Sequence, residues 1–305
     1  MSRSIRPEPL ATHTIAVGDL TFDALVAGPH DGRAVLLLHG FPQTSWSWRH
    51  VIPPLADAGY RVIAVDQRGY SAGASPDAVG EYAGERLVAD VLGVLDTLGL
   101  ASVDLVGHDW GAAVAWEVAS LHPERVTTLT AISVPHPGAF AEALATDADQ
   151  QSRSAYMRDF RRPGFERVLL ADDAAALRSI FEADAGVDVD HLISRLGSPS
   201  VLRRALSWYR AQSPSRALSI PATSVPTSHI WSDGDRYLGE QGTRATRRFV
   251  SGPYELHVLA GISHWVPEHA PERTAELILS HLRRFPGERR ATESREQPPA
   301  DTMEE

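Results

Sequence analysis

Short apolar runs alternate with helical patterns along most of this chain. Aliphatic and β-branched residues gather in eight stretches bounded by glycine, proline or polar residues, which predicts eight β-strands. The first two stretches alternate apolar and polar positions and the later ones are largely apolar, as expected where an antiparallel edge joins a buried parallel sheet. The strands are expected at 12–17, 20–27, 34–39, 61–66, 102–107, 126–133, 228–232 and 254–260.

Helical spacing of apolar residues fills several intervals between these strands. Residues 84–98 place their aliphatic side chains on one stripe, and residues 275–285 repeat that pattern near the end of the chain. Strands that alternate with helices predict an α/β fold with a mostly parallel eight-stranded sheet flanked by helices.

One region lacks any strand signal. From 137 to 221 there are only helix-forming stretches rich in alanine, leucine and arginine, interrupted at 163–164 and 197–199. Because ligand sites favour domain interfaces, we expect an inserted all-helical cap, or lid, over the ends of the sheet; a second helical domain without a functional role is the alternative. The predicted division is core 1–136, cap 137–221, core 222–286 and a disordered polar tail 287–305.

Composition narrows the class of protein. Of 305 residues, 43% are hydrophobic and 22% charged, which is ordinary for a globular chain. The net charge is −10 and all 29 basic residues are arginine, so we expect no nucleic-acid partner. The chain has no cysteine, which excludes disulfides, thiolate catalysis and cysteine-ligated metals.

The expected location follows from two observations. Residues 1–15 lack the apolar core of a signal peptide, and apolar runs reach about five residues against the ~20 that cross a bilayer. We therefore expect a cytoplasmic protein with no membrane partner. The sequence leaves a homodimer open.

The strongest motif is Gly-His-Asp-Trp-Gly, with Asp109 at its centre, directly after a predicted strand and before a helix-forming stretch at 112–121. Small residues two positions before and two after a central residue let the chain turn sharply and project that side chain above the sheet. The motif predicts a nucleophile elbow with an aspartate at its tip. An ordinary strand–turn–helix corner capped by Asp109 is the alternative.

Two later segments supply the remaining members of a catalytic triad. His264 follows the last predicted strand, and the segment 231–235 after the preceding strand offers Asp233 and Asp235. Nucleophile, acid and histidine in this chain order are typical of α/β-hydrolases. Asp235 is preferred because its spacing from the tryptophan at the start of that segment matches the family's W-G-x-x-D pattern, and Asp233 stays open as the fallback.

A second backbone element is the His-Gly-Phe-Pro-Gln segment at 39–43, after the third predicted strand. In the α/β-hydrolase fold one oxyanion-hole amide comes from this loop and the other from the residue after the nucleophile. We therefore expect the backbone N–H groups of Phe41 and Trp110 to form the oxyanion hole. His39 is expected to brace the turn rather than to take part in catalysis.

Taken together, these motifs resemble the epoxide hydrolase group of the α/β-hydrolase superfamily over residues 12–286. The resemblance rests on the elbow, the His-Gly-Phe-Pro loop, the Asp-Gln-Arg-Gly-Tyr run at 66–70 and the Ser-His-Trp run at 263–265. It implies the α/β-hydrolase fold with an inserted helical cap and an Asp-His-Asp triad. Several of these motifs are shared with dehalogenases.

The resemblance also implies a pair of cap tyrosines that act as the acid. Tyr156 matches the family's first cap tyrosine in its spacing to a following Phe, Pro and Gly, and Tyr209 lies in a Trp-Tyr-Arg run like that of the second. A phenol is a neutral donor at pH 7 and suits protonation of an alkoxide. The alternative is that both are packing residues of amphipathic helices.

An aspartate nucleophile restricts the substrate. Attack on an acyl group would give an anhydride, whereas attack on an sp³ carbon gives an ordinary alkyl ester that water can cleave. Asp109 thus indicates an epoxide or an alkyl halide, with His264 as the general base for water and Asp235 orienting the imidazole.

The sequence favours the epoxide over the halide. Haloalkane dehalogenases commonly have an asparagine where this chain has Phe41, and the chain contains none. Haloacetate enzymes carry an arginine at the position of Trp110, whose indole remains compatible with halide binding. We expect an epoxide hydrolase that forms a vicinal diol, with a small-molecule epoxide and water as partners; a dehalogenase is the alternative, and a non-catalytic receptor scaffold is a weaker one.

No cofactor and no metal are expected. His264, Glu268 and His269 are close in sequence, but their spacing is not H-E-x-x-H. Substrate specificity is expected to depend on the cap, and three residues there are expected to line the pocket: Met157, Phe160 and Trp208.

Overall fold

An eight-stranded mixed sheet forms the centre of the protein in the computed structural model, which describes residues 10–181 and 185–287. The strands are β1 (Ala11–Val17), β2 (Leu20–Ala27), β3 (Ala34–Leu38), β4 (Arg61–Val65), β5 (Val103–His108), β6 (Val126–Ile132), β7 (Thr227–Ser232) and β8 (Tyr254–Leu259). Their order is β1-β2-β4-β3-β5-β6-β7-β8, with β2 antiparallel to both neighbours and β3 to β8 parallel. The predicted fold class is confirmed, and each predicted strand lies within a residue of its expected bounds.

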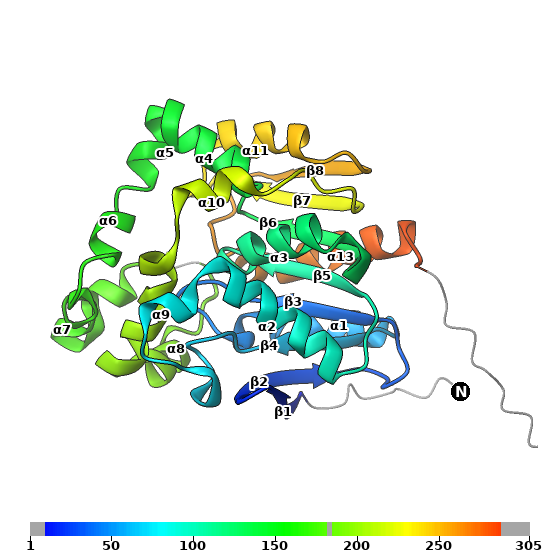
Figure 1. Ribbon diagram of the computed structural model, residues 1–305, viewed down its shortest axis with the longest axis horizontal. Helices are drawn as coiled ribbons and strands as arrows, with labels where there is room; N and C mark the ends of the chain where they lie inside the picture. Colours follow the sequence, from blue (N-terminus) through cyan, green and yellow to red (C-terminus); the bar gives the residue numbers. More distant parts are fainter. Residues whose placement is uncertain (1–9, 182–184, 288–305) are drawn as a thin grey trace, which may run out of the picture.

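Helices cover both faces of this sheet and one end of it (Figure 1). The α-helices are α1 (Ile52–Asp57), α2 (Gly84–Thr97), α3 (Trp110–Leu121), α4 (Pro137–Thr146), α5 (Ala148–Arg153), α6 (Met157–Phe160), α7 (Phe165–Arg178), α8 (Val189–Leu196), α9 (Pro199–Ala211), α10 (Pro214–Ser219), α11 (Glu240–Ala245), α12 (Val266–His269) and α13 (Pro271–Arg284). Short 3₁₀ turns are η1 (Ser45–Trp48), η2 (Ala72–Ala74), η3 (Val79–Tyr82), η4 (Pro123–Arg125) and η5 (Thr246–Phe249).

The buried strands divide the apolar core into two layers. Successive side chains of a strand point to opposite faces, so Leu36 and Leu38 of β3 pack with α2 and α3, while Val35 and Leu37 pack with α1 and α13. Figure 1 shows these helix pairs on the two faces of the sheet. This double cover explains why the parallel strands read as uninterrupted apolar runs.

Between β6 and β7 the described chain is helical, from α4 to α10, and these helices gather beyond one end of the strands (Figure 1). The ring centroids of Phe160 from α6 and Phe41 from the loop after β3 are 5.2 Å apart. Those of Tyr209 from α9 and Trp110 at the start of α3 are 5.0 Å apart. The insertion therefore covers the carboxyl ends of β3 and β5, where ligands bind in open α/β sheets.

Two further expectations concern the polar tail and a membrane partner. The predicted disordered tail lies outside the described residues apart from Gly287. Over 10–181 and 185–287, no helix combines the length and apolarity needed to cross a membrane.

Candidate active site

Asp109 lies at the sharp turn from β5 to α3. Its backbone has φ 53° and ψ −124°, a conformation that L-residues rarely adopt and that stores strain at functional turns. A Cβ on Gly107 would lie 2.3 Å from the carbonyl oxygen of Gly111, so the turn closes only because Gly107 has no side chain. The predicted elbow is thus formed, and it carries an aspartate at its tip.

Backbone amides hold the Asp109 carboxylate in place. The Phe41 N–H donates to Oδ1 at 2.7 Å, and the Trp110 N–H lies near enough to lower the pKa of the carboxylate. The loop can approach this closely because Gly40 lacks a Cβ, which would otherwise lie 2.2 Å from the same oxygen. The structure therefore brings both predicted oxyanion amides to the predicted nucleophile.

The surroundings favour the ionised form of Asp109. Burial acts to raise its pKa, but the hydrogen bond and charge of His264, the charge of His108 and the Trp110 N–H outweigh burial and lower the pKa below its ordinary value. Asp109 is a carboxylate at neutral pH, which is the form that can act as a nucleophile.

His264 lies between two carboxylates. Its Nδ1 is 2.7 Å from Asp235 Oδ2 and its Nε2 is 3.4 Å from Asp109 Oδ2. Burial acts to lower the pKa of His264, yet the charges and hydrogen bonds of the two aspartates raise it to about 10. The resting imidazole is thus protonated at neutral pH.

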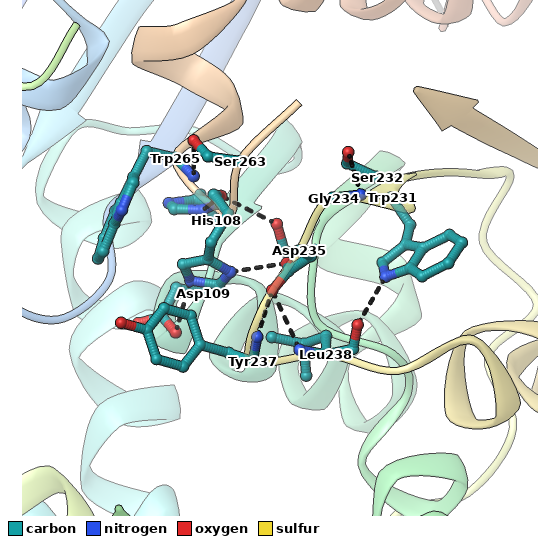
Figure 2. Close-up of polar contacts among 12 residues, drawn as sticks. His108, Asp109, Trp231, Ser232, Gly234, Asp235, Tyr237, Leu238, Ser263 and Trp265 are labelled. Atoms are coloured by element: carbon teal, nitrogen blue, oxygen red, sulfur yellow. Dashed lines mark hydrogen bonds and ion pairs between the residues drawn. The ribbon is translucent and has the colours of Figure 1, made fainter. Parts of the chain in front are cut away.

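Asp235, and not Asp233, contacts the histidine. Asp235 is buried, and its Oδ1 accepts hydrogen bonds from the N–H groups of Tyr237 at 2.8 Å and Leu238 at 3.0 Å, as the dashed lines in Figure 2 show. Asp233 is exposed and accepts a hydrogen bond from the N–H of Gly261 at 2.7 Å. The two amides fix the Asp235 carboxylate so that its other oxygen faces His264.

Two tyrosines face this group from the helical insertion. Tyr156 directly precedes α6 and Tyr209 lies in α9, and their rings pack edge to face with centroids 6.2 Å apart. Burial, followed by the nearby negative charge of Asp109 and other tyrosines, raises the pKa of both phenols well above the ordinary value. Both hydroxyls are therefore neutral proton donors at physiological pH. The Trp110 ring packs edge to face against that of Tyr209, with centroids 5.0 Å apart.

Two cavities meet at Asp109, with volumes of 460 and 180 Å³. Both are lined by Asp109, Tyr156 and Tyr209. Among the residues predicted for the pocket, Met157 lines the wide cavity and Phe160 the narrow one. The wide cavity is within the range of ligand sites.

The prediction that Trp208 lines the pocket is wrong. Trp208 lines neither cavity at Asp109. Its indole N–H donates to the backbone oxygen of Arg68 at 2.8 Å, and its ring lies against Trp110 and Tyr70. Trp208 instead packs α9 against the core of the protein.

Tyr237 is a site residue that the sequence did not reveal. It lines both cavities, and its ring centroid lies 5.0 Å from that of His264 and 5.3 Å from that of Tyr156. Its hydroxyl donates to the Ile180 oxygen at 3.0 Å. The signal that could have found it is its position two residues after Asp235, whose carboxylate accepts the Tyr237 N–H.

His39 braces the oxyanion loop. The Gln67 N–H donates to its Nε2 at 3.0 Å, so the ring hydrogen is on Nδ1 and donates to the Gly40 oxygen at 3.0 Å. Burial lowers the pKa of His39, so the ring is neutral. In the part of the chain that the structure describes, no cluster of three or more His, Asp or Glu side chains is arranged to hold a metal ion.

Comparison with known proteins gives a consistent result. A family model described as the alpha/beta hydrolase fold matches residues 33–271. The chain is 33% identical to AB hydrolase superfamily protein YfhM of Bacillus subtilis (87% of this chain, 95% of the relative) and 32% identical to epoxide hydrolase A of Mycobacterium tuberculosis (84% and 92%). Among solved structures, a Bacillus megaterium epoxide hydrolase in complex with an inhibitor superposes with a TM-score of 0.80 at 28% identity (89% of this chain, 100% of that one).

Proposed function

This chain belongs to the α/β-hydrolase superfamily, within its epoxide hydrolase group, and on that premise we propose that it converts an epoxide and water to a vicinal diol through an alkyl ester on Asp109. Its relatives include epoxide hydrolases from sources as different as Mycobacterium tuberculosis and Mus musculus. The role of each residue is proposed from the geometry of the site.

In the first step an oxygen of Asp109 attacks one ring carbon of the epoxide, and the bond from that carbon to the ring oxygen breaks. The hydroxyls of Tyr156 and Tyr209 hold the ring oxygen and give it a proton as it becomes an alkoxide. The apolar walls of the two cavities would hold the carbon substituents. This step needs an ionised carboxylate and neutral phenols. The lowered pKa of Asp109 and the raised pKa values of Tyr156 and Tyr209 favour these protonation states.

In the second step water cleaves the ester. Esterification removes the negative charge of Asp109, which is one cause of the raised pKa of His264, so the imidazole gives up its proton and the tyrosine pair regains the one it lost. Neutral His264, oriented by Asp235, then takes a proton from the attacking water. As the ester C–O bond breaks, the second proton of that water goes to the departing oxygen, which completes the diol and restores the Asp109 carboxylate. The N–H groups of Phe41 and Trp110 stabilise the oxyanion on the former carboxylate, a contribution of ~3 kcal/mol per donor.

The observation that carries the proposal is the pair of tyrosines, Tyr156 and Tyr209, that packs together and lines both cavities along with Asp109. A dehalogenase needs a pair of N–H donors for halide, but the chain has no asparagine to pair with Trp110, whose ring packs edge to face against Tyr209. An epoxide oxygen needs acidic hydroxyls, which the pair offers.

Product analysis tests the proposal directly. The purified protein is incubated separately with styrene oxide and with 1-chlorohexane; diol is measured by chromatography and halide by ion analysis. We expect diol from the epoxide, little halide from the chloride, and no diol with Asp109→Ala. Halide release without diol formation would replace the proposal by the dehalogenase alternative.

A further inference from the structure

Glu268 is a buried carboxylate that the steps above do not use. It lies in α12, four residues after His264, and is 6% exposed. Two side chains donate hydrogen bonds to its carboxylate: the amide of Gln43 and the guanidinium of Arg49. Glu268 therefore joins the loop of the histidine to the stretch that follows β3.

The first partner, Gln43, belongs to the 39–43 loop that also contains Phe41. The Gln43 N–H donates to the Gly40 oxygen at 2.9 Å, which closes the turn that contains Phe41. Among the described residues, the Gln43 side-chain oxygen has no hydrogen-bond partner, so its amide is anchored through Glu268. Movement of Gln43 would displace the turn that places the Phe41 N–H 2.7 Å from Asp109.

The second partner, Arg49, connects Glu268 to the helical insertion. Arg49 contacts Glu268 and also donates to the Gly186 oxygen at 3.0 Å. A Cβ on Gly186 would lie 2.8 Å from the Glu268 backbone oxygen, so this segment approaches α12 closely. The Asp188 carboxylate in turn accepts the indole N–H of Trp46 at 3.2 Å. Glu268 thus lies where three parts of the chain meet: the loop that carries His264, the 39–43 loop and the helical insertion.

We infer that Glu268 is a positioning residue for ester hydrolysis, holding the Phe41 amide and His264 in register on opposite sides of the Asp109 ester. The inference rests on the proposed function. Hydrolysis needs an oxyanion donor within about 3 Å of the developing charge while the base faces the water. Gln43 and Glu268 connect those two groups by a path that avoids Asp109 itself.

The two chemical steps should respond differently when this connection is cut. In the resting site the Phe41 N–H already bonds the Asp109 carboxylate, so a looser amide leaves the nucleophile no weaker for ring opening. The same looseness removes stabilisation from the oxyanion of the second step. A general loss of structure would instead reduce the amount of active enzyme and affect both steps alike.

The experiment separates the steps by rapid quench and intact-mass analysis with styrene oxide. Burial raises the pKa of Glu268 to about 7 despite the Arg49 guanidinium, so the rates are measured at pH 8.5, where the group is ionised. Glu268→Gln removes that charge, and Gln43→Met removes the donor while keeping the side-chain length. For each we expect ester hydrolysis to slow by about tenfold or more, and ester formation to stay within about threefold of wild type. The exchange variant Gln43→Glu/Glu268→Gln restores an amide-to-carboxylate hydrogen bond and should recover most of the hydrolysis rate.

Asp104→Asn is the matched control. Asp104 is also a buried carboxylate, paired with Arg33 and accepting from Thr128 Oγ1 at 2.7 Å, but it lies at the opposite end of β5, about 16 Å along the strand from Asp109. We expect it to lower the melting temperature without separating the two rates.

Several outcomes would overturn the inference. Hydrolysis unchanged in both Glu268→Gln and Gln43→Met, an equal loss of both steps, or the same separation of rates in Asp104→Asn would each contradict it. If Glu268→Gln does not fold, Gln43→Met carries the same test. Failure of the wild type to form either adduct or diol would refute the proposed function, and it is seen before any variants are compared.

Discussion

Replacing His264 by glutamine should trap the proposed ester. The imidazole Nε2 is 3.4 Å from Asp109 Oδ2, and glutamine at this position cannot act as a base for water. General-base catalysis contributes roughly 10²–10⁴-fold, so the ester should live longer by about that factor.

Ring opening should survive the same substitution because Asp109 remains ionised. Losing His264 removes the two largest causes of its lowered pKa, the hydrogen bond and the charge of the imidazole, but the Phe41 N–H still binds the carboxylate and the Trp110 N–H still lowers its pKa. Starting from the ordinary value of 3.8, the pKa would have to rise by about four units, ~5 kcal/mol, before the carboxylate became neutral at pH 8. Removing the protonated partner of a buried ion pair costs about 3–5 kcal/mol, which does not exceed this margin.

The assay is intact-mass analysis of His264→Gln mixed with styrene oxide at pH 8, followed by peptide mapping. The protein should gain the mass of one substrate on Asp109, and the double variant Asp109→Ala/His264→Gln should gain nothing. If His264→Gln carries no adduct at any time while the wild type forms diol, water attacks the epoxide directly, and the nucleophilic role of the aspartate at the elbow is refuted.

The remaining predictions concern the acid pair, the cavities and the histidine. Tyr156→Phe/Tyr209→Phe should slow ester formation by about 10²–10⁴-fold while an ester already formed hydrolyses normally, which single-turnover kinetics measures; full activity would contradict the assignment. Ala176→Phe should narrow the 180 Å³ cavity, and Ala145→Phe should narrow the 460 Å³ cavity. Each variant should therefore lower kcat/KM for a different set of epoxides by about tenfold or more. Identical substrate profiles for the two variants would count against two subsites. Because the folded pKa of His264 is raised from 6.5 to about 10, its protonation stabilises the fold fully below 6.5 and that stability is lost as pH rises through about 10; the melting temperature of wild type relative to His264→Gln should therefore fall between pH 7 and pH 10.5, and a constant difference would show that the raised pKa is wrong.

Much of the fold could be predicted from the sequence because its determinants are local. Aliphatic runs such as 34–38 are buried on both faces, and the glycines around Asp109 are required by the turn itself. Chain order then placed His264 and the 231–235 segment at the same edge of the sheet as the elbow. The choice between Asp233 and Asp235 needed the structure, because it depends on which carboxylate receives the amides of the following turn.

The error at Trp208 has a simple geometric cause. Consecutive residues on an α-helix point about 100° apart, and in α9 this rotation turns Trp208 away from the cavities that Tyr209 lines. The apolar positions Leu202, Leu206 and Tyr209 follow helical spacing. Tyr209 reaches the cavity from the end of that stripe, and Trp208 points to the core beside it. Tyr237 was missed for a different reason, since it lies in an irregular segment where no periodicity fixes the direction of a side chain.

The charges of the site impose an order on the two proposed steps. Three groups share one buried region: the Asp109 and Asp235 carboxylates and the His264 imidazole between them, with a net charge of −1 when the imidazole is protonated. While Asp109 is charged, it keeps His264 protonated and therefore unable to act as a base, so water is not activated before the substrate has reacted. Ester formation converts Asp109 to a neutral group, the pKa of His264 falls, and a base appears beside the bond that water must attack. In the proposed mechanism Asp109 thus controls the base through its charge, which a serine, neutral at rest, could not do in the same way.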